Sequence, residues 1–160
     1  MLPRFPHALV RTSLVLGFAA FTLACGGPLG PIAGGELSGT VVAEPVADWS
    51  FAGSEETIAV ETRPDDPHSV TTWCVTIDGQ LYVPSRDPDD KEWVAYLREN
   101  SRARIRVGDE IYELQAIELS DETEIRAVAD ALVAKYELER PSDSEPPKLA
   151  FFRFEPRTTP

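Results

Sequence analysis

The sequence is poor in the residue types from which most catalytic and metal sites are built. Its 160 residues include two histidines, His7 and His68, and two cysteines, Cys25 and Cys74. A structural zinc site takes four such ligands, and a Ser/His/Asp triad needs a histidine beside its nucleophile. A glycine-rich phosphate loop of the Walker type is also missing. We therefore predict no metal site and no catalytic set of these kinds.

Basic residues are scarce. The chain has 15 lysines and arginines against 27 aspartates and glutamates, a net charge of −12. Residues 1–24 contain two arginines and no acid, so their removal leaves 13 basic against 27 acidic residues, or −14. Such a surface repels the phosphate backbone of nucleic acids, and we predict no nucleic-acid partner.

Long apolar runs are absent. The run from Ser13 to Leu23 has about a dozen residues, whereas a helix needs about 20 to cross a bilayer. It follows a basic start and ends at Ala24-Cys25, which is typical of an export signal. The ending Thr22-Leu23-Ala24-Cys25 resembles the lipobox of bacterial lipoproteins, although Thr22 stands where leucine is usual. A plain secretory signal cut near Cys25 is the alternative.

The lipobox resemblance divides the chain into three parts. It implies that residues 1–24 are a lipoprotein signal peptide, and we expect residues 25–35 to be a Gly/Pro-rich tether and residues 36–160 to be the folded domain. Cys25 would be lipidated and would anchor the protein to a membrane of the cell envelope, since two or three acyl chains hold stably where one does not. Gly26 in place of aspartate implies the outer membrane if the host has one. Cys74 is then alone, and we expect it to be a small buried hydrophobe.

The remaining chain alternates strands and helices. The strongest signal is a hairpin over residues 69–84, because Asp78-Gly79 supplies the positive φ angles of a type I′ turn between two apolar runs. A second hairpin joins 102–107 to 110–119, with arginines on the outer face of its first strand. Further strands are expected at 37–46, 57–62 and 149–155, and helices at 91–100 and 121–139. Asp89 or Asp90 should cap the first helix, and Asp121 with Glu124 the second.

These elements predict an α+β domain, a small antiparallel barrel with two outer helices. Their order over residues 57–136 resembles the split β-barrel of the pyridoxamine phosphate oxidases and deazaflavin-dependent nitroreductases. The residues at matching places are Asp78-Gly79, Leu81-Tyr82-Val83, Trp93, Leu97, Asn100, Arg104, Arg106 and Gly108.

The resemblance implies a groove for FMN or a deazaflavin, often between two subunits. The implied phosphate-binding residues are Arg63, Ser69, Thr71, Ser85 and Arg86, and Trp93 would border the ring. The loops 64–67 and 87–90 argue against this site, because they carry prolines and carboxylates where the family has glycines and lysines.

Two functions remain open. The first is a lipid-anchored envelope protein whose non-catalytic split barrel binds a small ligand or a protein partner. The alternative is an exported FMN- or deazaflavin-dependent oxidoreductase of the nitroreductase kind. Both allow a homodimer, and the aromatic final strand with Phe151, Phe152 and Phe154 is expected to supply its apolar surface.

Overall fold

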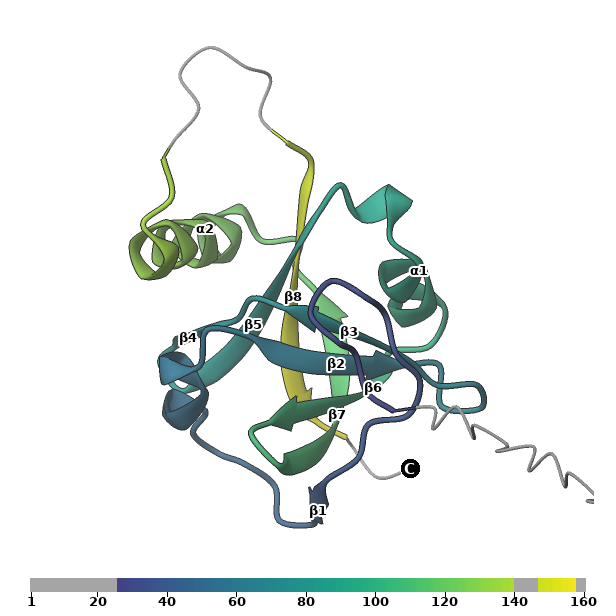
Figure 1. The fold of residues 1–160 in the computed structure, drawn as a ribbon. Helices are drawn as coiled ribbons and strands as arrows, with labels where there is room; N and C mark the ends of the chain where they lie inside the picture. The colour runs from purple at the N-terminus through teal and green to yellow at the C-terminus, as the bar shows by residue number, and fades with distance from the viewer. Residues whose placement is uncertain (1–25, 140–146, 158–160) are drawn as a thin grey trace, which may run out of the picture.

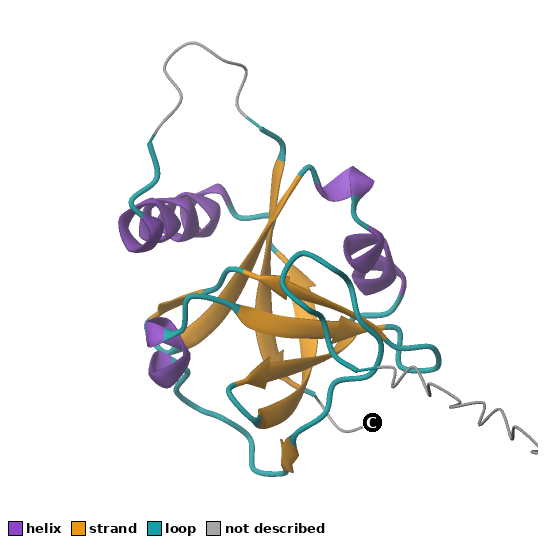
Figure 2. Cartoon of the chain, in the orientation of Figure 1, coloured by secondary structure: helices purple, strands orange, loops and turns teal. Residues whose placement is uncertain are grey.

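The computed structural model describes residues 26–139 and 147–157. Over these residues eight strands form one strongly curled sheet, with two α-helices packed outside it (Figures 1 and 2). The strands are β1 (Thr40–Val42), β2 (Ile58–Thr62), β3 (His68–Thr72), β4 (Val75–Ile77), β5 (Gln80–Arg86), β6 (Arg102–Val107), β7 (Glu110–Glu118) and β8 (Leu149–Pro156). The helices are α1 (Glu92–Glu99) and α2 (Glu122–Tyr136), with 3₁₀ turns at Ser50–Ser54 and Pro88–Asp90.

The sheet follows the order β3-β2-β6-β7-β8-β5-β4, with antiparallel pairing at every step. The short strand β1 pairs in parallel with β7 and lies off this path. The predicted split-barrel class, α+β with two outer helices, is confirmed.

The central hairpin is confirmed at its turn and corrected in its first strand. Ile77 pairs with Gln80 across Asp78 and Gly79, whose φ angles are 49° and 75°. The run before the turn is not one strand, however, because it breaks at Trp73-Cys74. β3 pairs with β2, whereas β4 pairs with β5. β3 and β5 therefore do not pair, and the barrel stays open along the seam between them.

The break has a tertiary cause. The backbone N–H of Cys74 donates to the hydroxyl of Tyr136 at 3.0 Å. This N–H therefore bonds to a side chain of α2 and not to a carbonyl of a neighbouring strand. The same hydroxyl donates to the carbonyl of Glu56 at 2.7 Å. One tyrosine of α2 thus ties together two segments at the open edge of the sheet.

The two larger apolar cores lie on opposite faces of the sheet. The barrel interior holds Trp49, Ile105, Phe152 and Phe154, each at most 2% exposed. The outer core lies under α2 and contains Val75, Tyr82, Val128, Leu132 and Phe151. Successive residues of β8 thus point into different cores, because side chains alternate across a strand.

The alternation on β8 overturns the predicted dimer surface. Phe151, Phe152 and Phe154 are 3%, 2% and 1% exposed. Both faces of the strand are covered by the chain itself, so these rings have no apolar area left for a second subunit. Any homodimer must use another surface.

Of the two predicted helix caps, one is wrong and one is present. Lys91 is the N-cap of α1 and makes no side-chain capping bond, so the prediction for Asp89 or Asp90 is wrong. The 3₁₀ turn at Pro88–Asp90 carries these carboxylates away, and Asp89 accepts from Arg98 at 3.2 Å. Asp121 caps α2 as predicted, accepting from the backbone N–H of Glu124 at 2.8 Å. The other half of the predicted capping box is not formed, since the side chain of Glu124 accepts from Tyr82 and Arg153.

Replacing Asp121 by alanine should lower the free energy of unfolding by about 1 kcal/mol, because the N–H of Glu124 loses its acceptor. Asp121→Asn keeps an acceptor of similar capping strength and should stay close to wild type. Urea unfolding followed by tryptophan fluorescence measures both. Equal losses in the two variants would contradict the cap.

The segment before β1 is folded onto the sheet. The N–H of Gly35 donates to the carbonyl of Gly26 at 3.1 Å, and Gly34 pairs with Ser69 of β3. Residues 26–35 of the predicted tether therefore form a closed loop, seen in Figure 1 as the purple loop in front of β3. The predicted signal peptide 1–24 and Cys25 lie outside the described residues. None of the helices in the described part of the chain is long and apolar enough to cross a membrane.

Candidate functional site

A large hollow lies at the open seam between β3 and β5. It is a groove of about 940 Å³ whose third wall is the face of α2. The two strands are not paired with each other, and side chains from β3, β5 and α2 line the space between them. The groove is lined by Gly30, Pro31, Glu56, Thr57, Thr71, Thr72, Trp73, Pro84, Arg86, Ala129, Leu132, Val133, Leu138, Glu139, Pro147, Leu149 and Phe151.

The groove is mainly apolar, and an aromatic ring stands at its rim. Leu132 and Phe151 are buried, whereas Trp73 is 41% exposed. The indole of Trp73 stacks on the ring of Tyr136, with centroids 4.5 Å apart and planes at 15°. Tyr136 is itself held by its hydroxyl hydrogen bonds to Cys74 and Glu56. Tyr136 thus holds Trp73 in place, and Trp73 is the aromatic residue in the lining of the groove, of the kind that stacks on flat ligand rings.

The charges around the groove do not favour a phosphate group. Arg86 brings one guanidinium, which is 75% exposed and lies 3.6 Å from the carboxylate of Asp87. Two lining residues, Glu56 and Glu139, are acidic. A phosphate dianion would meet one paired cation and several carboxylates, so electrostatics favour a neutral or weakly charged ligand.

Of the six predicted cofactor residues, the structure brings two to the groove. Thr71 and Arg86 line it. Arg63 lies elsewhere, in a turn where its guanidinium pairs with Asp66 and donates to the hydroxyl of Tyr96 at 3.0 Å. The same guanidinium lies over the Tyr96 ring, 4.6 Å from its centroid.

The other three predicted residues are buried in the fold. The Ser69 hydroxyl donates to the carbonyl of Gly35 at 2.6 Å and so holds the loop 26–35. Pro84 and Arg86 face the groove, so the alternation of β5 turns Ser85 to the other face of the sheet, where it is 4% exposed. Trp93 is 7% exposed and packs against Phe152 with ring centroids 5.7 Å apart. Cofactor binding by any of the six stays a prediction.

The main groove residues that the sequence reasoning missed are Trp73 and the face of α2. Trp73 had one usable signal, because strand alternation places it opposite the expected buried Cys74. The apolar stripe of α2 was recognised, but periodicity alone does not say that Leu132 and Val133 would wall a groove.

Cys74 is fully buried beside the groove, as predicted. Its Sγ lies 3.7 Å from Nζ of Lys135, and nothing in the sequence indicated that this lysine lies near Cys74. Burial nevertheless raises the pKa of the Cys74 thiol, and Lys135 lowers it by less. Lys135 donates instead to the carbonyls of Glu55 at 2.6 Å and Cys74 at 2.9 Å, so the cation secures the chain around the strand break.

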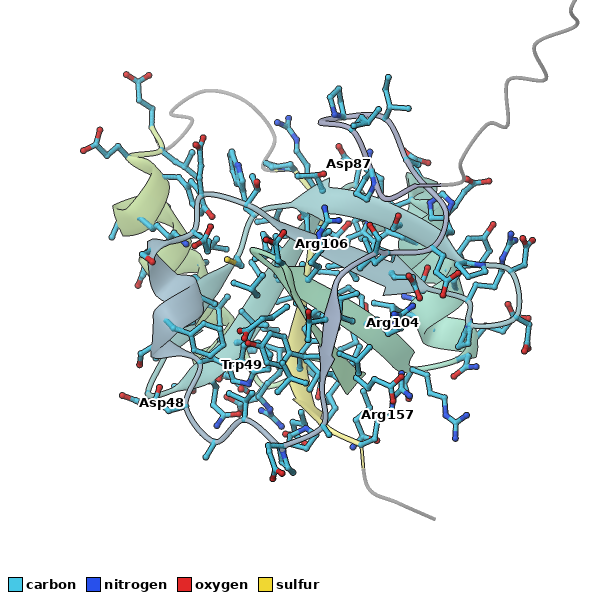
Figure 3. The ribbon with its side chains drawn as sticks, turned by 60° about the horizontal axis from the view of Figure 1, so that its bottom comes forward. Asp48, Trp49, Asp87, Arg104, Arg106 and Arg157 are labelled. Atoms are coloured by element: carbon cyan, nitrogen blue, oxygen red, sulfur yellow. The ribbon has the colours of Figure 1, made fainter. Side chains whose placement is uncertain are left out.

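A second, polar hollow of about 350 Å³ lies near β2 and β6, and Figure 3 labels two of its arginines, Arg104 and Arg157. Arg104 pairs with the buried carboxylate of Glu61 at 2.9 Å. Arg157 donates to the carbonyls of Leu114 at 3.1 Å and Ala103 at 3.0 Å. Both guanidinium groups thus bond to other groups of the fold, so we do not count this hollow as a candidate ligand site. No group of three or more metal-ligating side chains occurs among the described residues.

The comparisons with known proteins identify the fold. The sequence matches no protein-family model and no curated protein. A conserved hypothetical protein from Mycobacterium tuberculosis superposes with a TM-score of 0.54 at 19% identity, over 74% of this chain and 86% of that one. A pyridoxamine 5′-phosphate oxidase-like protein from Listeria innocua gives 0.52 at 14% identity, over 68% and 90%.

A protein assigned to 5-nitroimidazole antibiotic resistance in Bacteroides thetaiotaomicron gives a TM-score of 0.51 at 14% identity, over 70% of this chain and 81% of that one. At these identities the likeness concerns the fold. The resemblance seen in the order of elements is confirmed at that level: the chain has the split-barrel fold of the pyridoxamine 5′-phosphate oxidase-like proteins.

Proposed function

We propose that this chain is a lipid-anchored cell-envelope protein whose split barrel binds one flat, largely apolar small molecule without transforming it. The observation that carries the proposal is the groove at the open seam, with its apolar walls and the stacked pair of Trp73 and Tyr136. Such a groove recognises the area and flatness of a ring system. The anchor rests on the lipobox-like sequence that ends at Cys25.

The proposal that the barrel is not catalytic rests on the groups at the groove. Its lining residues include no histidine and no cysteine, and its single arginine, Arg86, lies beside Asp87. The buried thiol of Cys74 has a raised pKa and therefore favours its unreactive, protonated form. We therefore assign these groups the role of holding a ligand and orienting it.

The second candidate is an exported FMN- or deazaflavin-dependent oxidoreductase. It is favoured by the fold shared with a pyridoxamine 5′-phosphate oxidase-like protein. It is also favoured by Thr71, Thr72 and Arg86, three hydrogen-bond donors on the apolar groove. Here the ring would lie along the apolar wall near Trp73, and Arg86 would meet the phosphate, while the bound cofactor would supply the redox chemistry.

The two candidates differ in whether the phosphate group of the ligand contributes to its affinity. Residues 26–160 should be titrated with riboflavin, FMN and a deazaflavin, following ligand fluorescence. Under the first proposal riboflavin and FMN bind with similar affinity. Trp73→Ala should weaken the binding of both by about tenfold through lost stacking, whereas Arg86→Ala should change either affinity little. Arg63→Ala is the matched control, because Arg63 lies outside the lining of the groove.

The oxidoreductase is supported instead if FMN or the deazaflavin binds at least about tenfold tighter than riboflavin and Arg86→Ala removes the difference. A reductase assay with the bound cofactor would then measure turnover. If none of the three ligands binds saturably to protein with a normal unfolding transition, neither proposal holds for a flavin-like ligand.

A further inference from the structure

The loop that follows the predicted anchor exposes two large aliphatic side chains. Leu29 is 76% exposed and Ile32 is 67% exposed, the highest values among large hydrophobic residues in the described part of the chain. Both belong to one four-residue turn whose centre is Gly30-Pro31. Single exposed aliphatic residues are common on protein surfaces, but two at the tip of one turn form a small apolar wedge.

The wedge is built into the fold. The backbones of Leu29 and Ile32 exchange two hydrogen bonds, at 3.1 and 3.0 Å. Gly34 exchanges two more with Ser69 of β3, each 2.8 Å long. A Cβ atom on Gly34 would lie 2.4 Å from the carbonyl carbon of Gly27, so the loop closes only because this residue has no side chain. The turn therefore projects its side chains from a fixed position on the sheet.

A cation lies beneath the wedge. A hollow of about 360 Å³ under the turn is lined by residues of the loop and by Arg106 of β6, with no carboxylate in its lining. Figure 3 shows Arg106 under the loop, and its Nη1 donates to the carbonyl of Ser38 at 3.4 Å. An arginine beside exposed aliphatic side chains, in an otherwise acidic protein, matches the phosphate and acyl layers of a lipid surface.

The position in the sequence identifies the partner. Cys25, the predicted acylation site, immediately precedes the loop. Leu29 is four residues further on, a reach of at most about 14 Å even for an extended chain. The headgroup layer on each side of a bilayer is only about 5 to 8 Å thick. Acyl chains on Cys25 would thus hold the wedge within reach of the acyl boundary.

We propose that the turn Leu29–Ile32 inserts into the surface of the phospholipid bilayer that holds Cys25, with Arg106 meeting lipid phosphates. This inference rests on the lipid anchor of the proposed function and adds a second, oriented contact to it. Gly30 and Pro31 of the same turn also line the groove. Inserting the turn therefore places one rim of the ligand groove beside the membrane surface, which an anchor on a free tether would not do.

The test uses the full chain, processed by a bacterial host and reconstituted into vesicles of phosphatidylethanolamine and phosphatidylglycerol. The variants Leu29→Cys, Ile32→Cys and Val41→Cys each receive an environment-sensitive NBD label. Val41 of β1 is the matched control, an exposed aliphatic residue outside the loop. Labelling is selective, because Cys74 is fully buried and Cys25 carries the acyl chains.

The expected result is a blue-shifted emission at positions 29 and 32 that aqueous iodide quenches poorly, with a water-like emission at 41. Adding Gly34→Ala to Leu29→Cys should return the label toward water, because the loop then opens. Water-like emission at both 29 and 32, in protein whose acylated Cys25 is verified by mass spectrometry, would overturn the inference and leave the anchor intact. An unmodified Cys25 would overturn the anchor and the inference with it.

Discussion

Arg104→Ala is expected to lower the free energy of unfolding by about 3 to 5 kcal/mol, the cost of leaving a buried charge without its partner. The carboxylate of Glu61 has a side chain only 4% exposed, and Arg104 of the adjacent strand β6 pairs with it at 2.9 Å. Its remaining hydrogen bond comes from the backbone N–H of Leu37. Urea unfolding of residues 26–160, followed by tryptophan fluorescence, measures the loss.

Two further variants separate burial from a general effect of charge. Arg102 occupies the same strand and the same face but is exposed, so Arg102→Ala should change stability by less than about 0.5 kcal/mol. Glu61→Leu in the Arg104→Met background removes both charges and should recover most of the loss. An Arg104→Ala variant as stable as Arg102→Ala would show that the pair contributes nothing to the fold.

Phe154→Ala is expected to cost about 3 to 5 kcal/mol, through lost apolar burial and the cavity left in the barrel. Phe154 is 1% exposed and pairs across the sheet with Leu81 on β5 and Ala116 on β7. Leu149→Ala at the start of the same strand is the control. Leu149 is 49% exposed, so this variant should lose well under half as much stability.

The same experiment tests the corrected account of the final strand. Because Phe154 is buried within one chain, the loss should appear in the unfolding of the protomer and should not depend on protein concentration. Light scattering at micromolar concentration should give the same mass for wild type and Phe154→Ala under native conditions. If the variant keeps its unfolding midpoint but changes its oligomeric state, Phe154 lies at a subunit interface and the correction is wrong.

The hydrogen bonds around the strand break link the fold to the groove. The hydroxyl of Tyr136 accepts from the N–H of Cys74, just after the end of β3, and the Tyr136 ring stacks on Trp73, so one side chain of α2 contacts both the strand break and the aromatic residue of the groove. The strand break and the groove thus share a contact with the same residue of α2.

Local elements of this protein were determined by the sequence itself. The Asp78-Gly79 turn, the alternation of Arg102–Val107 and the cap at Asp121 depend on neighbouring residues, and each appears where it was predicted. The order of these elements predicted an antiparallel barrel with outer helices, and its resemblance to a known family predicted the split barrel, which the structure confirms.

The candidate site was decided by tertiary structure. Cys74 and Tyr136 are 62 positions apart in the chain, and their contact sets the break that opens the groove. Strand alternation, once that register was established, turned Arg86 toward the groove and Ser85 away from it. The partners of Arg63 and the burial of Phe154 likewise depend on elements far along the chain. Local periodicity carries no information about such distances, so only the folded chain shows which predicted residues share a site.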